Sequence, residues 1–148
     1  MNYRKATIWD AVRIVEMWNE MISEVPYLKD TNADPERFYF HILGRIKDPN
    51  HSVIVAESNK EIVGFITGYM TKADYSDKLV GFCDNAFVDK KYMGGKVYFD
   101  LIAQIYESGV KAGAQEVKFQ QKYSPMLLKV WERKKFKPRY MVFSMEVT

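Results

Sequence analysis

The chain has little of several residue types, and each shortage excludes a class of protein. Cys83 is the only cysteine in 148 residues, so the chain cannot build a disulfide framework or a cysteine-based zinc cluster within itself. His41 and His51, the two histidines, lie on different expected elements, which argues against a metal site. No apolar run approaches the ~20 residues that cross a bilayer, and the start, MNYRKATIWD, has no apolar signal core. We expect a cytoplasmic protein with no membrane partner.

The chain also has no repeat at solenoid spacing, no low-complexity stretch and no Ser/Gly linker, so a single domain over residues 1–148 is predicted. That length is enough to bury about two thirds of the surface that the unfolded chain exposes. The net charge is +3 and the pI is near 8.8. This small excess of positive charge suits a phosphate-bearing small molecule as well as a nucleic acid.

Apolar periodicity predicts two helices in the first third of the chain. After a short strand at 3–7, apolar side chains recur at helical spacing through 9–24. A second, shorter helix is expected over 32–48, where Asp34 can serve as the N-cap and Pro35 occupies the first helical position.

Strands and helices alternate in the rest of the chain. Residues 51–57 and 61–71 are expected to form a hairpin around the polar turn SNKE. The remaining expected elements are a long strand over 78–89, a helix over 95–114, a strand over 115–121, a helix over 124–136 with Ser124 as N-cap, and a closing strand over 139–147. The order β-α-α-β-β-β-α-β-α-β predicts an α/β domain whose sheet mixes hairpins with crossovers.

The stretch KKYMGGKVYF places two adjacent glycines between a strand and a helix. A helix N-terminus that follows a strand exposes amide groups without an internal partner and carries the positive end of the helix dipole, so it can bind an anion. Glycines let that anion approach the backbone. A turn between a strand and a helix also often needs a residue at positive φ for structural reasons alone. The motif by itself leaves a phosphate loop and a plain turn both open.

The order and spacing of the elements resemble the acyl-CoA N-acyltransferases of the GNAT superfamily over nearly the whole chain. The resemblance is carried by YRKATIWDAVRIVEMWNEM, VIVAESNKEIVGFITGYM, NAFVDKKYMGGKVYFDLI and SPMLLKVWERKKFKPRY. It implies an α/β fold with a mixed, mostly antiparallel sheet, a splayed central strand pair and helices on both faces. It also implies that acetyl-CoA enters the gap between the splayed strands and rests its pyrophosphate on the glycine loop.

The acetyl-CoA-binding loop is a degenerate version of the family pattern. Val88 and Tyr92 match the valine and tyrosine that usually precede it, and in that register three key positions fall on Met93, Lys96 and Tyr98, which all depart from the pattern. Lys96 could still contribute a charged donor to phosphate. The residues that the resemblance assigns to acetyl-CoA are Phe87, Val88, Met93, Gly94, Gly95, Lys96, Val97, Tyr98 and Ser124.

Acyl transfer to an amine needs an acid that protonates the departing thiolate. Many proteins of the family use a tyrosine in a phrase like Leu-Tyr-Glu-Lys-x-Gly-Phe, which resembles VWERKKF here. Trp131 stands in place of that tyrosine and Lys135 in place of the glycine, and an indole cannot donate this proton. Tyr123 and Tyr140 flank the last helix and are the candidate acids, although a tyrosine in such a place more often serves packing.

The reaction also needs a base that removes a proton from the acceptor ammonium. Asp84 is the first candidate, because it precedes the apolar AFV of the fourth strand and burial would raise the pKa of its carboxyl. Alternatively, Asp84 serves only to satisfy a bulge in the splayed strand. Glu24, Tyr27 and Tyr39 belong to the region between the first two helices that lines the acceptor pocket in the family.

The leading hypothesis is an acetyl-CoA-dependent N-acetyltransferase that moves an acetyl group to a primary amine of a small molecule or peptide by direct transfer in a ternary complex. One alternative is a GNAT fold without this activity that serves as a binding or regulatory protein, with its cleft filled by Tyr98 and Trp131. Another is an altered-donor enzyme that modifies nucleic acid through the basic last third of the chain. The acceptor is not readable, and both a monomer and a homodimer fit the sequence.

Overall fold

The computed structural model describes residues 1–24, 32–120, 125–139 and 145. The strands span Asn2–Lys5 (β1), His51–Ser58 (β2), Glu61–Lys72 (β3), Leu79–Val88 (β4) and Glu116–Phe119 (β5). The α-helices span Ala11–Glu24 (α1), Pro35–Lys47 (α2), Lys96–Lys111 (α3) and Pro125–Arg133 (α4). Short 3-10 helices span Ile8–Asp10 (η1) and Lys90–Tyr92 (η3). The predicted α/β order is confirmed over these residues. The expected closing strand at 139–147 falls almost entirely outside them.

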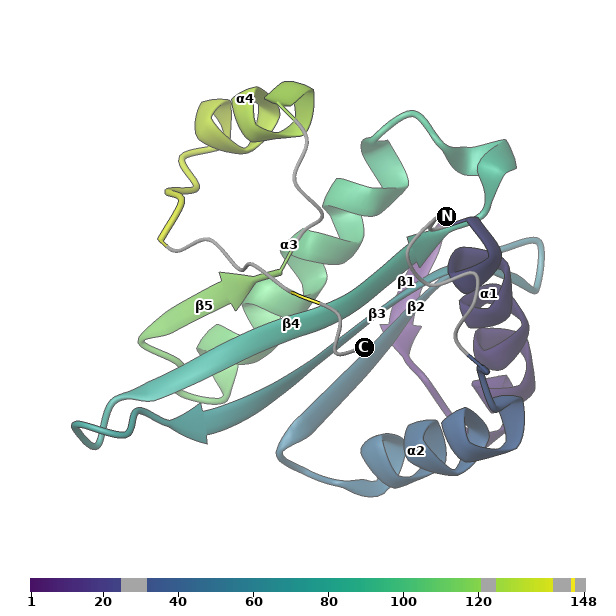
Figure 1. The fold of residues 1–148 in the computed structure, drawn as a ribbon, viewed down its shortest axis with the longest axis horizontal. Helices are drawn as coiled ribbons and strands as arrows, with labels where there is room; N and C mark the ends of the chain where they lie inside the picture. Colours follow the sequence, from purple (N-terminus) through teal and green to yellow (C-terminus); the bar gives the residue numbers. More distant parts are fainter. Residues whose placement is uncertain (25–31, 121–124, 140–144, 146–148) are drawn as a thin grey trace.

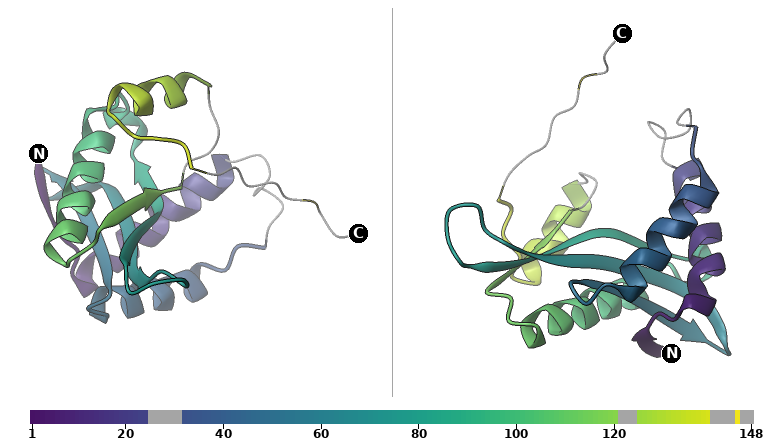
Figure 2. Two further views of the ribbon diagram at one scale, coloured as in Figure 1. Left: turned by 90° about the vertical axis from the view of Figure 1, so that its left-hand side faces the viewer. Right: turned by 90° about the horizontal axis from the view of Figure 1, so that it is seen from below.

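The five strands of the described chain form one sheet in the order β1-β2-β3-β4-β5. All neighbours are antiparallel except β4 and β5, which are parallel. Helices α1 and α2 cover one face, and α3 lies on the other (Figures 1 and 2). The predicted mostly antiparallel sheet with helices on both faces is therefore confirmed. No helix of the described part of the chain is both long and apolar enough to cross a bilayer.

A helix cap and a hairpin turn lie where the sequence predicted them. The Asp34 carboxylate accepts hydrogen bonds from the amides of Glu36 and Arg37, both at 3.1 Å, so it caps α2 as expected. The hairpin turn places Asn59 and Lys60 at φ of 50° and 67°, the left-handed pair that matches the twist of two adjoining strands.

Two helices end earlier than predicted, and both have a residue at positive φ just beyond their ends. Helix α3 stops at Lys111, and Gly113 has φ of 95°. Helix α4 stops at Arg133, and Lys135 has φ of 66°. A left-handed residue cannot continue a right-handed helix, which explains why the apolar pattern overestimated both lengths.

The alternating strand residues divide the core into two halves, one on each face of the sheet. The half on the α1 and α2 face contains Val53, Val55, Phe65 and Phe87 from the strands and Ile14, Met17, Phe38 and Ile42 from the helices. The half on the α3 face contains Ile54, Ala56, Ile66 and Val88 from the strands and Leu101, Ile105 and Trp131 from the helices. Because Trp131 belongs to the second half, α4 packs on the same face as α3.

Strand β4 is paired with β5 over only half of its length. The parallel register runs from Val80 opposite Glu116 to Cys83 opposite Phe119, and the Gln120 amide makes one more hydrogen bond to the Cys83 carbonyl at 3.1 Å. From Asp84 to Val88, β4 has no β5 partner among the described residues. We call this segment the open half of β4, and it lies where the family resemblance predicts the splay.

A β-bulge marks the start of the open half of β4. Thr67 of β3 is opposite Asn85 and Gly68 is opposite Cys83, so Asp84 is the extra residue. A bulge re-aims the side chains around it, and it is often found next to functional sites. The alternative interpretation of Asp84 as a bulge residue is therefore correct about its place in the strand.

Candidate functional site

The glycine loop connects the open half of β4 to α3. Gly95 is the N-cap of α3 and has φ of 90°, a left-handed conformation that favours glycine. A Cβ added at Gly94 would meet no atom within 4 Å, so this backbone faces open space. The first amides of α3 have no acceptor within the helix, since the first bond, from the Phe99 amide, goes to the Gly95 carbonyl at 3.0 Å. These residues fit an anion such as a pyrophosphate.

Lys96 extends the positive charge of the loop into solvent. Its ammonium group binds the Asp100 carboxylate at 2.7 Å, and the Lys96 side chain is 85% exposed. Asp100 also accepts a hydrogen bond from the Tyr3 hydroxyl at 2.6 Å. These two hydrogen bonds, that of Lys96 first, lower the pKa of the Asp100 carboxyl. Because an exposed ion pair contributes little free energy, Lys96 can exchange Asp100 for a bound phosphate at small cost.

An aromatic cluster fills the space between α3, β5 and α4. Trp131 stands at its centre, with ring centroids 6.3 Å from Tyr98, 5.6 Å from Phe119 and 4.5 Å from Phe136. Trp131 is only 8% exposed, so its indole packs in the core. Burial, with a contribution from the nearby Cys83 thiol, raises the pKa of Tyr98 to about 12, and the phenol therefore keeps its proton at neutral pH.

A polar cluster lies on the opposite face of the sheet, around the bulge. Arg45 of α2 binds Asp84 through two parallel hydrogen bonds, Nη1 to Oδ1 at 2.9 Å and Nη2 to Oδ2 at 2.7 Å. The buried Thr67 hydroxyl donates to Asp84 Oδ1 at 2.7 Å and accepts from Asn85 Nδ2 at 3.3 Å. We call Arg45, Thr67, Asp84 and Asn85 the bulge cluster.

The expectation that burial leaves Asp84 with a raised pKa is wrong in its net direction. Burial does raise the pKa, but the hydrogen bonds from Arg45 and Thr67 outweigh it and hold the pKa of the carboxyl below its usual value. The reason was not visible in the sequence, because Arg45 looks like an ordinary cation at the C-terminal end of a helix. A carboxylate held in this way is a weak base.

Aromatic side chains continue this face of the sheet beside the bulge cluster. Tyr69 and Phe82 stack with ring centroids 5.4 Å apart, and Lys118 Nζ lies 5.4 Å from the Phe82 centroid. Tyr69 is two residues after Thr67 in β3, so both side chains point to the same face. An acceptor that approached Asp84 from this face would contact aromatic surface as well as charge.

His41 lies one helical turn before Arg45, on the same side of α2. His41 is exposed as a residue, but partial burial of its ring lowers the pKa of the imidazole, the Arg45 charge lowers it further, and the Asp84 charge acts in the opposite direction. His41 is therefore neutral at neutral pH. The sequence offered one signal for it, the spacing of four residues between His41 and Arg45.

The other predicted site residues have different surroundings. Phe87, Val88 and Val97 are buried at 7%, 6% and 8% exposure, so only their backbone can face a ligand. Glu24 forms an ion pair with Lys90 of η3 at 2.8 Å. Tyr39 packs edge-on to Phe40 with centroids 5.6 Å apart and contacts the core on the α1 and α2 face. The predicted residues outside the described chain are Tyr27, Tyr123, Ser124 and Tyr140.

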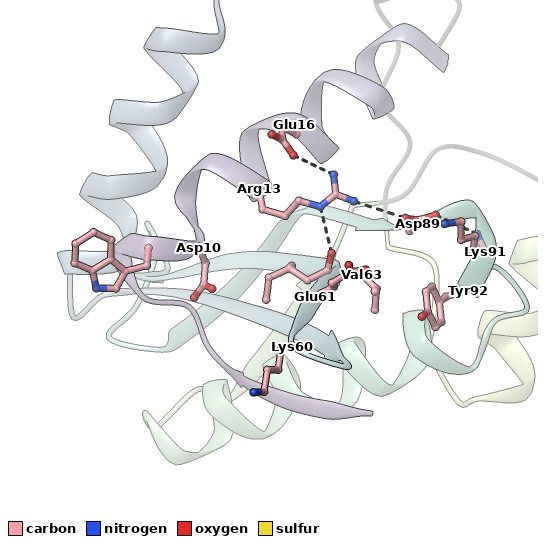
Figure 3. A pocket seen from close by; sticks show the side chains of 11 residues that line it. Asp10, Arg13, Glu16, Lys60, Glu61, Val63, Asp89, Lys91 and Tyr92 are labelled. Carbon is pink, nitrogen blue, oxygen red and sulfur yellow. Dashed lines mark hydrogen bonds and ion pairs between the residues drawn. The ribbon is translucent and has the colours of Figure 1, made fainter.

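A cavity of about 490 Å³ lies between the start of α1, the β2–β3 turn and η3 (Figure 3). Arg13 crosses its middle, donating to the Ile62 carbonyl at 3.3 Å and pairing with Glu16 at 3.2 Å and Asp89 at 3.6 Å. Because these neighbours already neutralise Arg13, its role is to hold Asp89, at the start of the loop, against α1.

Comparisons with known proteins agree with this geometry. The model of the acetyltransferase (GNAT) family matches residues 14–132. Curated protein sequences include no match to this chain.

Solved structures share the fold at low sequence identity. A transcriptional regulator from Bacillus halodurans C-125 is 19% identical, with a TM-score of 0.82, and 99% of each chain is covered. A ribosomal-protein-alanine N-acetyltransferase from Brucella melitensis biovar Abortus 2308 is 13% identical, with a TM-score of 0.72 over 99% of this chain and 100% of that chain. An aminoglycoside acetyltransferase from an uncultured soil metagenomic sample, in complex with sisomicin, is 19% identical, with a TM-score of 0.73 over 99% of this chain and 95% of that chain.

Proposed function

Because the chain belongs to the acetyltransferase (GNAT) family, we propose that it moves the acetyl group of acetyl-CoA to a primary amine by direct transfer in a ternary complex. The observation that carries this proposal is the open half of β4. At one end of it the glycine loop presents amides and a lysine, and at the other end the bulge cluster presents a carboxylate. One strand thus connects a place for a phosphate-bearing donor with a place for a cationic acceptor.

On the donor side, the backbone of the glycine loop would hold the pyrophosphate of acetyl-CoA. Gly94 offers the open space, and Gly95 starts the helix whose positive end faces it. Lys96 would leave Asp100 and add a charged hydrogen bond to the phosphate. Acetyl-CoA is a substrate here, and it supplies the reactive thioester.

On the acceptor side, Asp84 would attract the ammonium group of the acceptor. Arg45 and Thr67 keep its carboxylate ionised and fixed in direction, so Asp84 acts on the acceptor by charge. Glu24 and Tyr39 remain proposals for more distant contacts with the acceptor. Tyr123 and Tyr140, which bracket α4 in the sequence, remain our candidates for the acid that protonates the thiolate.

A second candidate function is a binding or regulatory protein of the same fold that does not use acetyl-CoA. The aromatic cluster favours it, because Tyr98 and Trp131 pack together beside the gap that a donor must enter. The similar transcriptional regulator from Bacillus halodurans C-125 is consistent with such a role. This candidate requires that acetyl-CoA does not bind.

Isothermal titration of the protein with acetyl-CoA separates the two candidates, with desulfo-CoA and ADP showing which part of the donor is recognised. We expect saturable binding that ADP partly reproduces. Lys96→Glu should weaken it at least about tenfold, because a charge-assisted hydrogen bond contributes roughly 1.5–3 kcal/mol. Lys72→Glu is the matched control, since Lys72 is also exposed and paired with an aspartate, Asp77 at 3.4 Å. No binding by the unchanged protein would reject acetyl transfer.

Acceptor classes are then compared by following release of free CoA. The probes are sisomicin, a peptide that begins with alanine and a peptide with an internal lysine. The first two are chosen because one similar solved structure is an aminoglycoside acetyltransferase in complex with sisomicin and another is a ribosomal-protein-alanine N-acetyltransferase. We expect at least one amine to be acetylated.

A further inference from the structure

We propose that His41 is the base that accepts a proton from the acceptor amine, an assignment that rests on the proposed acetyl transfer. His41 lies one helical turn before Arg45, and the Arg45 side chain reaches the bulge of β4 to bind Asp84 at 2.7 Å. By this spacing His41 lies on the same side of α2 as Arg45, and α2 covers this face of the sheet (Figure 2). His41 is exposed, so an acceptor can reach it from solvent.

Asp84 is unsuited to this role because both of its oxygens are occupied. Oδ1 accepts from Arg45 and Thr67, and Oδ2 accepts from Arg45. A proton on Asp84 would break the paired hydrogen bonds that hold the bulge. His51 is also occupied, since its Nδ1 lies 2.9 Å from the Asp48 carboxylate. Within the described residues the ring nitrogens of His41 make no hydrogen bond, and its ring contacts Phe38 with centroids 6.2 Å apart.

The charges around His41 favour a neutral imidazole that can still be protonated. Arg45 and Arg37 on its own helix and His51 at the start of β2 lower its pKa, in addition to the larger effect of burial. Asp84 on β4 raises it. The free enzyme therefore presents a base at neutral pH, and the Asp84 carboxylate stabilises the imidazolium once the proton has arrived.

The transfer balances with two protons leaving the acceptor nitrogen. His41 takes the first from the ammonium group, and the freed electron pair attacks the carbonyl carbon of the thioester. The new C–N bond forms, the C–S bond breaks, and its electron pair leaves on the sulfur of CoA. The second nitrogen proton ends on that thiolate, giving free CoA and a neutral amide. His41 then releases its proton to solvent, which its exposure allows.

His41→Gln tests the assignment, and His51→Gln is the matched control. With the amine that is acetylated most rapidly in the panel, we expect His41→Gln to lower kcat about 100-fold. Its acetyl-CoA affinity and its unfolding midpoint should stay unchanged, and added imidazole should restore part of the rate. The unchanged enzyme should lose kcat/KM on the acid side as a group with a pKa below the usual histidine range becomes protonated, and His41→Gln should lack this decline. His51→Gln should keep the rate and the decline, with the decline moved slightly to higher pH because the His51 charge no longer lowers the pKa of His41.

A second readout does not depend on turnover. Ring NMR signals should show His41 titrating below the usual histidine range, moving upward in Arg45→Gln and downward in Asp84→Asn, because the removed charges act in opposite directions. A His41→Gln enzyme with unchanged kcat and pH profile would overturn the assignment and leave acetyl transfer standing. Acetyl-CoA binding without acetylation of any amine in the panel would overturn the proposed function, and the role of His41 with it.

Discussion

The two faces of the sheet are built by different forces where they border the open half of β4. On the α1 and α2 face, the bulge cluster is held by short, directional hydrogen bonds around one ion pair. On the α3 face, the aromatic cluster around Trp131 is held by packing. Directional bonds fix where a charge points, whereas packed rings fix volume and exclude water. The acceptor side should therefore be sensitive to charge and pH, and the donor side to side-chain size.

The largest effect should come from removing the centre of the aromatic cluster. Trp131→Ala should lower the free energy of unfolding by about 4 kcal/mol, as expected for truncation of a buried large aromatic residue. Urea denaturation followed by circular dichroism measures it. Trp9 is 86% exposed, so Trp9→Ala removes the same side chain at little cost. Equal effects of the two substitutions would mean that packing does not hold this face.

Breaking the ion pair on the other face should cost somewhat less. Arg45→Met keeps much of the side-chain volume but leaves Asp84 charged and largely buried, at 21% exposure, which should cost about 3 kcal/mol. Adding Asp84→Asn removes the unpaired charge, so the double variant should recover part of the loss in the same denaturation experiment. Lys72→Met, which breaks an exposed pair, should change stability by less than about 1 kcal/mol. If the losses of unfolding free energy in Arg45→Met and Asp84→Asn simply added in the double variant, the two side chains would not stabilise each other.

The two faces should also differ in their response to acid. The pKa of Asp84 is lower in the folded protein than in the unfolded chain, so its contribution to stability is present above the unfolded value of about 4. That contribution is lost as the pH falls through the folded pKa. Asp84→Asn should therefore be less stable than the unchanged protein at neutral pH, with the difference shrinking below about pH 4. Thermal unfolding between neutral and acid pH measures this difference. Trp131→Ala should show a constant difference over the same range.

Features with a local cause could be predicted from the sequence. The Asp34 cap, the two-residue hairpin turn and the amphipathic faces of α1 and α2 each depend on residues within a few positions of one another. The order of elements, and with it the family, followed from these signals. The ion pair of Lys96 with Asp100 also has the helical spacing of four residues that sequence reasoning can read.

Features caused by contacts between distant positions could not be predicted. Arg45 and Asp84 are 39 positions apart, and their pairing reverses the direction in which burial alone moves the pKa of Asp84. The sequence shows Trp131 in place of a tyrosine and leaves open whether it fills the cleft with Tyr98, whereas the structure shows it as the centre of a cluster that includes Phe119 and Phe136. The spacing of four residues relates His41 to Arg45, but the sequence does not show that Arg45 binds Asp84 at the bulge.

The smallest effect on stability should come from the glycine loop, and it decides between a phosphate loop and a plain turn. Gly95→Ala puts a side chain on a residue whose backbone is left-handed, so the free energy of unfolding should fall by about 1 kcal/mol in urea denaturation. Gly94→Ala adds a Cβ that meets no atom within 4 Å, so stability should not change. If the loop holds the pyrophosphate, the same methyl group occupies the space that the anion needs, and acetyl-CoA affinity measured by titration should fall several-fold. Unchanged affinity in a Gly94→Ala protein of unchanged stability would mean that the two glycines only turn the chain from the sheet into the helix.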